Sequence, residues 1–273
     1  AEHRPCSHAE YHAETEHDSS SSLRLFEESP ARYYHTRITR RIPPKPETDA
    51  MRLGTATHIA ILEPEKIHEL LEIIPREVLA SNGAKSGKKW DAYKAEFGHK
   101  VLVKQDEFDA IRWQVESVWS NKQCRMVLER STVKEHSLFW TDKHGRKLKC
   151  RMDAAGELDG LLVDVKRTGR SERDFWRCVH GFKYHCQAAL YCQGFKAYYG
   201  IRPLFHFLLV EDAPPYEARV RTLPLEALKL GHRENQDTLE RLYRCKRDGA
   251  PWESEGYSEI REVELPPFFY GEM

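Results

Sequence analysis

The middle of the chain carries a pattern of apolar and polar positions that predicts three consecutive strands. Residues 132–141 (TVKEHSLFWT) alternate well enough for a strand, and two apolar runs follow at Lys147–Met152 and Leu161–Val165. Turn sequences separate these runs at Asp142–Gly145 and at Asp159-Gly160. Because strands joined by short turns pair with each other, we expect a three-stranded antiparallel meander.

Helical patterns stand on both sides of this meander. Met51–Leu62 is an apolar helical segment that ends at Glu63-Pro64, and Lys183–Tyr199 is a second helix after the third strand. The apolar run Leu204–Val210 follows that helix, so a crossover would place it parallel to an earlier strand. The order αβββαβ predicts an α/β fold with one central mixed sheet flanked by helices.

The two ends of the chain differ from this core. Residues 1–20 are polar, rich in histidine and glutamate, and end in a serine run, so we expect a disordered tail. We expect residues 21–273 to form a single domain, with its core at about 51–211 and a strand, a helix and a tail at 212–273. The aromatic residues within 265–270 are expected to pack onto the domain or onto a neighbouring subunit.

Composition narrows the class of protein without deciding its function. Forty-three basic residues balance forty-three acidic ones, which still allows a basic groove beside an acidic face. No apolar run approaches about 18 residues and the first residues lack a signal-peptide pattern, so we expect a cytoplasmic protein without membrane contact. The seven cysteines are odd in number and lack a CxxC pair, which disfavours structural zinc and a disulfide framework.

The meander carries the strongest candidate chemistry. Asp153 comes as the second apolar run ends, and Asp164 and Lys166 lie two residues apart in the third, so they share a face. Two carboxylates and an ammonium group on adjacent strands suit divalent-metal phosphodiester hydrolysis. Glu135 in the first strand either projects towards the same site or is an exposed strand acid. Taken alone, these residues fit a surface hairpin with an ion pair better than a catalytic site, and the rest of the chain has to decide between the two.

Further candidates lie on the two helical segments. Gln187 and Tyr191 are four residues apart and share a helix face, with Tyr184 flanking them. An aromatic stripe of this kind is either core packing or a binding face. His58 lies on the first, apolar helix, where it is either a satisfied core residue or a metal ligand.

Basic residues outside these helices and strands are weaker candidates for nucleic-acid contacts. Lys88 and Lys89 are followed by Trp90, and basic residues interleaved with aromatic ones can hold a nucleic-acid strand. A solubilising loop explains them equally well. Arg52 is a candidate for contacting a DNA phosphate.

Five of these motifs occur in the order found in the PD-(D/E)xK nucleases. They are Gly54-x-x-x-His58, Glu135, Arg151-Met152-Asp153, Asp164-Val165-Lys166 and Gln187-x-x-x-Tyr191. Together they resemble the RecE-like exonucleases, relatives of lambda exonuclease and of the RecB nuclease domain, over about residues 20–199. Met152 stands where Ile, Val or Pro is commoner, and Asp replaces the commoner Glu at position 164. The cysteines of the branches that carry an iron–sulfur cluster are missing, so the resemblance implies no such cluster.

The resemblance assigns roles to the candidate residues. It implies that one or two Mg²⁺ or Mn²⁺ ions are bound by His58, Asp153, Asp164 and the Val165 carbonyl. Because imidazole is not a favoured Mg²⁺ ligand, we expect Mn²⁺ to support activity as well. Lys166 would position or deprotonate the attacking water, and Glu135 would hold a further water. Gln187 and Tyr191, with Tyr184 beside them, would position the DNA backbone.

The resemblance also implies an activity and partners. The activity is 5′→3′ digestion of linear double-stranded DNA, which leaves 3′ single strands for recombination by annealing. The assembly is a ring-shaped homo-oligomer that encloses the duplex. A single-strand annealing protein of the RecT or Red-beta type would be the partner, in a bacterial or phage-infected cell. A PD-(D/E)xK endonuclease and a non-catalytic nucleic-acid-binding protein on the same fold remain the alternatives.

Overall fold

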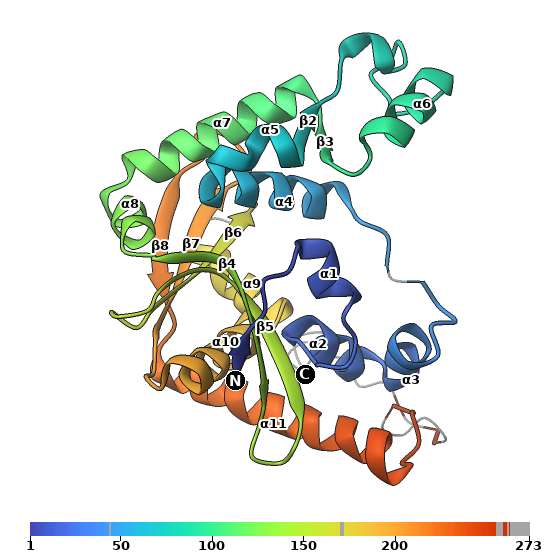
Figure 1. Cartoon of the computed structure of the whole chain (residues 1–273), viewed down its shortest axis with the longest axis vertical. Coiled ribbons are helices and arrows are strands. Elements are labelled where there is room, and N and C mark those ends of the chain that lie inside the picture. The colour runs from blue at the N-terminus through green and yellow to red at the C-terminus, as the bar shows by residue number, and fades with distance from the viewer. Residues whose placement is uncertain (44, 170–171, 255–258, 261, 263–273) are drawn as a thin grey trace, which may run out of the picture.

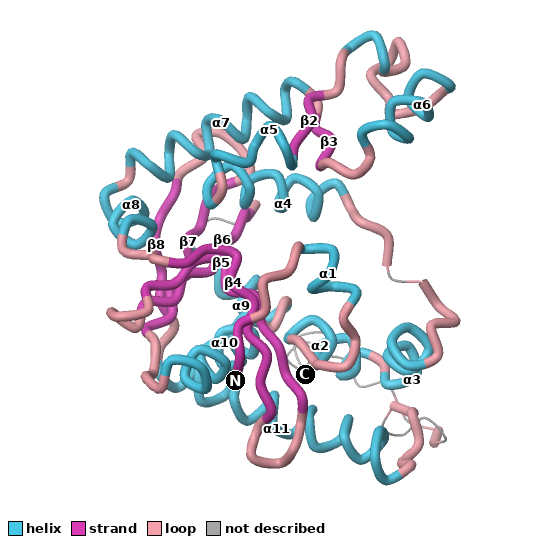
Figure 2. Tube along the Cα trace, viewed as in Figure 1, coloured by secondary structure: helices cyan, strands magenta, loops and turns pink. Residues whose placement is uncertain are grey.

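A central six-stranded sheet organises the protein (Figures 1 and 2). The computed structural model describes residues 1–43, 45–169, 172–254, 259–260 and 262. The aromatic segment 265–270 lies outside the described residues. In spatial order the strands are β1 (Glu2–His3), β4 (Val133–Thr141), β5 (Lys147–Gly156), β6 (Leu161–Thr168), β7 (Leu204–Glu211) and β8 (Ala218–Thr222).

The strand pairing confirms the predicted mixed sheet. β4, β5 and β6 form the antiparallel meander, and β7 lies parallel to β6 over eight paired residues, from Leu161↔Leu204 to Thr168↔Glu211. β8 then pairs antiparallel with β7. The crossover from β6 to β7 runs through two α-helices, which is typical of a parallel connection. The αβββαβ order is therefore present.

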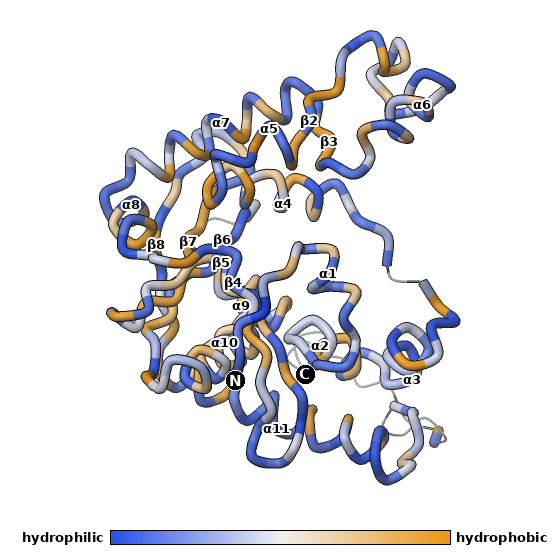
Figure 3. Tube along the Cα trace, viewed as in Figure 1, coloured by the Kyte–Doolittle hydropathy of each residue, from blue (hydrophilic) through white to orange (hydrophobic). Residues whose placement is uncertain are grey.

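Helices cover both faces of the sheet (Figure 1). On one side lie α4 (Asp49–Leu62), α7 (Gln105–Ser120) and α8 (Lys122–Glu129). On the other side lie α2 (Ser20–Glu28), α9 (Phe175–Gly181), α10 (Tyr184–Tyr199) and α11 (Leu225–Asp248). Shorter helices are α1 (His8–Ala13), α3 (Pro30–Tyr33) and α5 (Ile67–Leu70). In Figure 3, hydrophobic and hydrophilic residues intermingle along α11, as expected for a helix with one buried side.

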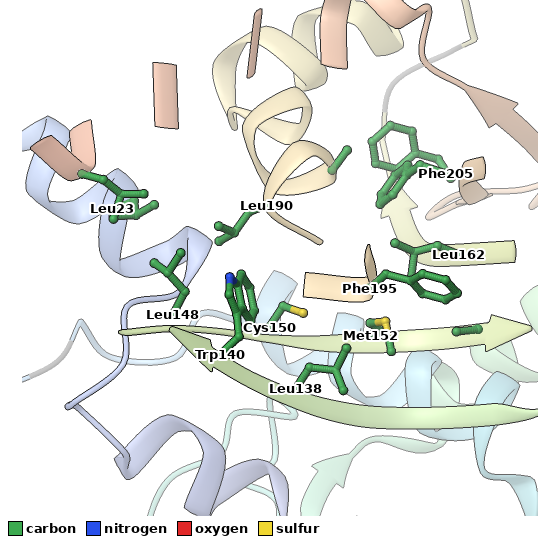
Figure 4. Packing of buried hydrophobic residues seen from close by; sticks show 14 of the residues in the cluster. Leu23, Leu138, Trp140, Leu148, Cys150, Met152, Leu162, Leu190, Phe195 and Phe205 are labelled. Carbon is green, nitrogen blue, oxygen red and sulfur yellow. The ribbon is translucent and has the colours of Figure 1, made fainter. Parts of the chain in front are cut away.

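Alternation along β6 decides which side chains face which helix layer. Val163 and Val165 pack in the core beneath α4, α7 and α8, whereas Leu162 packs in the core on the α10 side. Side chains two apart share a face, so Asp164 and Lys166 point with Leu162 towards α10. Figure 4 shows this second core, where Phe195 of α10 lies close to Met152 of β5.

A small extension projects from the α4 end of the molecule (Figure 1). It contains the parallel pair β2 (Leu71–Ile73) and β3 (Val101–Val103) together with α6 (Lys88–Phe97). A separate small core holds it together, in which Trp90 packs with Ile74 and Leu102. The extension is joined to the main sheet through α4 and α7 rather than through strand pairing.

The prediction that residues 1–20 are disordered is wrong. β1 pairs antiparallel with β4, which makes this segment part of the main sheet. Ser7 and Glu10 form a reciprocal capping box that starts α1. Asp18 is fully buried and accepts hydrogen bonds from the Tyr33 hydroxyl at 2.6 Å and from Lys246 Nζ at 2.6 Å. These partners stabilise an ordered segment despite its polar composition.

Candidate active site

The site lies where β5 and β6 separate. The two strands pair only at Ala154↔Val163, Ala155↔Leu162 and Gly156↔Leu161. The next opposing positions are Asp153 and Asp164, and there the strand pairing stops. Instead, the backbone N–H of Val165 donates to Asp153 Oδ2 at 2.7 Å. A side-chain carboxylate thus takes the place of a strand carbonyl, and two acidic residues meet at the fork.

Asp164, Lys166 and Gln187 form one half of the site. Lys166 Nζ lies 2.7 Å from Asp164 Oδ2, and Gln187 Nε2 of α10 donates to Asp164 Oδ1 at 2.8 Å. Asp164 is only 1% exposed, so this ion pair and hydrogen bond compensate its buried charge. The ring of Tyr184 lies 4.9 Å from Lys166 Nζ. Tyr191, on α10 like Gln187, is half-buried and packs against the core between the sheet and this helix.

His58, Glu135 and Asp153 form the other half. They come from α4, β4 and β5, and one ligand atom of each lies within 4.8 Å of the others. His58 Nε2 lies 2.8 Å from the Val165 carbonyl oxygen, and Nδ1 lies 3.6 Å from Asp153 Oδ2. Because a carbonyl can only accept, Nε2 carries the hydrogen. Nδ1 faces Asp153, so with the hydrogen on Nε2 a lone pair on Nδ1 would be available to a metal ion held beside that carboxylate.

Glu135 is held in an unusual backbone conformation. Its φ angle is +49°, in the left-handed region that non-glycine residues rarely adopt. Arg151 fixes the side chain, since its Nε donates to Glu135 Oε2 at 2.7 Å and its Nη1 donates to Ser137 Oγ at 2.9 Å. Such strain costs of order 1–3 kcal/mol and clusters at functional sites. The sequence pattern does not reveal this role of Arg151, because the pairing of Ser137 with Arg151 depends on strand register.

The electrostatics of the site favour a bound cation. Burial raises the pKa of Asp153 to about 7; His58 and Lys166 lower it, while Asp164 and Glu135 raise it further. Burial alone would lower the pKa of Lys166, but attraction to Asp164 and Asp153 raises it above its usual value. Lys166 is therefore an ammonium group. Lys166 pairs with Asp164 and Arg151 pairs with Glu135, so the three carboxylates outnumber these two cations by one. The remaining carboxylate and the imidazole of His58 form a donor set that fits Mg²⁺ or Mn²⁺.

Asp164 adjoins the three-residue cluster but is not part of it. Both of its carboxylate oxygens contact Lys166 or Gln187. The structure therefore brings His58, Asp153 and the Val165 carbonyl together directly, while metal ligation by Asp164 stays a prediction. Of the predicted DNA contacts, Gln187 and Tyr184 lie at the site. Lys88 and Lys89 are exposed on α6, in the extension away from the fork (Figure 1), and their role also stays a prediction.

The prediction that Arg52 binds DNA is contradicted by its surroundings. Arg52 is buried on α4, where Nη2 donates to Glu107 Oε1 at 2.6 Å and to Asp49 Oδ1 at 2.9 Å. Nη1 donates to the Leu102 carbonyl oxygen at 2.8 Å. The guanidinium group thus connects α4 to the start of α7 and to β3. A phosphate could reach it only by breaking these contacts.

Replacing Arg52 by methionine should destabilise the protein rather than weaken DNA binding. The change leaves the largely buried Glu107 without its charged partner, at a cost of about 3 kcal/mol in the free energy of unfolding. Denaturant unfolding measures this loss. Lys88→Met, at an exposed position on α6, is the control and should change stability by less than about 0.5 kcal/mol. A stable Arg52→Met protein with weakened DNA affinity would contradict our interpretation.

Comparison with known proteins agrees with this fold. The model of the family DUF3799, a PDDEXK-like domain of unknown function, matches residues 19–262. The chain belongs to this family. This PDDEXK-like chain is also similar to a crystal structure from Eubacterium rectale described as a "Putative exonuclease", with a TM-score of 0.64 and 13% sequence identity over 98% of each chain. At that identity the likeness shows the fold alone. No curated protein matches the chain.

Family and fold together establish a PD-(D/E)xK architecture. The Asp164-Val165-Lys166 motif lies on β6 and the Asp153 motif on β5, as the resemblance implied. Within the described residues, every helix is too short or too polar to cross a lipid bilayer.

Proposed function

We propose that this PDDEXK-like chain is a divalent-metal-dependent DNA exonuclease. It would digest linear double-stranded DNA 5′→3′ and leave 3′ single strands. The observation that carries this proposal is the fork of β5 and β6, which brings Asp153 within the His58 and Glu135 cluster and holds Asp164 against Lys166. The family assignment supports nuclease chemistry, and the resemblance of the motifs supports digestion from an end.

Each residue of the fork has a separate role in the proposed hydrolysis. His58, Asp153 and Glu135 would hold the ion, with the Val165 carbonyl beside them; the ion would supply Lewis-acid activation of the phosphodiester and of the attacking water. The Lys166 ammonium donates hydrogen bonds to a phosphate oxygen and offsets the charge that develops there. Gln187 keeps Asp164 in place, and Asp164 keeps Lys166 aimed at the phosphate. Arg151 keeps Glu135 turned into the site.

A comparison of linear and closed circular duplexes tests this function. With Mg²⁺ or Mn²⁺, we expect nucleotides to be released from linear DNA and closed circular DNA to stay intact, because an exonuclease requires an end. Labelling one strand at its 5′ end and then at its 3′ end gives the polarity, and early release of the 5′ label is expected. Chelation by EDTA should stop the reaction, since the carboxylates and His58 cannot replace the ion.

The other outcomes identify the alternative functions. Linearisation of closed circles would identify an endonuclease with the same fold. Binding of DNA without any metal-dependent cleavage would identify a non-catalytic binding protein.

A role in recombination extends the proposal and rests on the resemblance. It includes a phage or bacterial setting, a ring-shaped homo-oligomer and a single-strand annealing protein as partner. Sedimentation of the purified chain tests the ring, since a monomer at working concentration would remove it from the proposal.

A further inference from the structure

Two neighbouring aromatic rings extend from Lys166, and the outer of the two is exposed. Tyr184 places its ring 4.9 Å from Lys166 Nζ, and the Phe182 ring lies 5.5 Å from that of Tyr184, centroid to centroid, at an interplanar angle of 32°. Phe182 is 53% exposed. Two rings therefore lead from the ammonium group of the site to solvent.

The backbone beneath this ring is held rigidly. Phe182 and Lys183 form the whole link between α9 and α10. The Phe182 N–H donates to the Cys178 carbonyl oxygen at 2.9 Å, and the Phe182 carbonyl oxygen accepts from Arg24 Nη1 at 3.4 Å. Because the link is only two residues long and both backbone groups of Phe182 are hydrogen-bonded, the Phe182 backbone is held in place.

Lys183 holds the other half of the link. Its φ angle is +56°, a left-handed conformation that costs energy for a non-glycine residue. Its ammonium group forms ion pairs with Glu27 at 3.1 Å and with Glu234 at 2.8 Å. The structure thus maintains a strained turn that holds Phe182 at the surface against the ring of Tyr184.

Other exposed aromatic residues differ from Phe182 in their surroundings. Trp176 on α9 is 59% exposed, but the guanidinium group of Arg177 already lies over its ring at 4.8 Å. Trp113, also 59% exposed, lies on α7 in the helix layer on the opposite side of the sheet. Single exposed hydrophobic residues are ordinary. Phe182 is distinguished by its contact with Tyr184, which itself adjoins Lys166, and by its hydrogen-bonded backbone.

We infer that Phe182, with Tyr184 behind it, is a stacking site for an unpaired nucleobase of the strand being cut. Lys166 Nζ, the Tyr184 ring and the Phe182 ring follow one another at 4.9 Å and 5.5 Å. These distances are short enough for a base to stack on Phe182 while a neighbouring phosphate of the same strand contacts Lys166. Aromatic rings bind bases of any sequence because every base presents a π face. The substrate at this site is a frayed or single-stranded DNA end. The inference rests on the proposed function.

Steady-state digestion of linear duplex DNA tests the site with three variants. Phe182→Ala should raise KM about tenfold while kcat stays within about twofold, since a lost stack weakens binding without altering the lysine. Phe182→Trp should keep KM near the wild-type value, because a larger ring still stacks. Trp113→Ala is the control and should leave both constants unchanged. A wild-type KM for Phe182→Ala, or an equal loss in Phe182→Ala and Phe182→Trp, would overturn the inference.

Binding of a fluorescent oligonucleotide separates this inference from the proposed function. A single strand with 2-aminopurine at its end should lose fluorescence on binding wild-type protein, and Phe182→Ala should abolish that quenching. If wild-type protein cuts no DNA, the proposed function fails, and quenching that requires Phe182 still supports the stacking site. Equal quenching by wild type and Phe182→Ala, or none by either, would overturn it.

Discussion

Replacing Lys166 by alanine is expected to lower the rate of DNA cleavage by about a thousandfold or more. In the proposed mechanism this partly buried ammonium group donates to the phosphate, and attraction to Asp164 and Asp153 keeps it charged. The ligand cluster of His58 and Glu135 with Asp153 does not contain Lys166, so metal binding should persist. Single-turnover cleavage of linear duplex at saturating protein measures the rate of the chemical step.

A fold control accompanies this variant. Removing Lys166 leaves the buried Asp164 with Gln187 as its remaining partner, which should cost about 3 kcal/mol of stability. Melting curves therefore have to show that Lys166→Ala is folded at the assay temperature. Lys143→Ala removes an exposed lysine from the β4–β5 turn and should cut DNA at the wild-type rate. Cleavage by Lys166→Ala within tenfold of wild type would contradict a catalytic role for the lysine.

The meander and the helix order could be predicted because local sequence determines them. Alternation with a period of two fixes which side of β6 carries Asp164 and Lys166, and helical spacing places Gln187 on α10. The fork itself could not be predicted. The apolar run predicts a second strand that ends at Met152, whereas β5 continues to Gly156 and pairs with β6 only over its last three residues. The point at which β5 and β6 stop pairing depends on a side-chain contact, the hydrogen bond from the Val165 N–H to Asp153. The local pattern of apolar and polar residues does not reveal such a contact.

Long-range partners explain the other errors. Residues 1–20 have the composition of a disordered tail, but Asp18 finds Lys246 across the fold. Arg52 has the charge of a phosphate ligand, but Glu107, 55 positions along the chain, neutralises it in the core. The type of a charged residue and its neighbours in sequence do not reveal whether the fold buries it against distant partners. Among the described residues, the Ser7–Glu10 capping box was the local signal that could have corrected the first error.

Replacing Asp153 by asparagine is expected to abolish metal-dependent cleavage and yet stabilise the metal-free protein. Burial raises the folded-state pKa of Asp153 to about 7, above its usual 3.8, so the folded protein resists losing this proton. The resulting penalty is absent below about pH 4, grows as the pH rises to about 7, and is complete above it. Asparagine carries no charge, and its side-chain oxygen can still accept from the Val165 N–H. At pH 8 with EDTA, the variant should gain up to about 4 kcal/mol over wild type.

Added Mn²⁺ should reverse this order. An ion that binds only the folded state raises Tm, and it should do so strongly in wild type because it neutralises the carboxylates around His58. Asp153→Asn removes a ligand, so its Tm should respond weakly to the ion. Asp159→Asn is the control, since Asp159 pairs with Arg130 in the β5–β6 turn and should leave the response to Mn²⁺ unchanged. If Asp153→Asn were less stable than wild type in EDTA at pH 8 and responded equally to Mn²⁺, Asp153 would be a structural acid, and the fork would hold no metal through it.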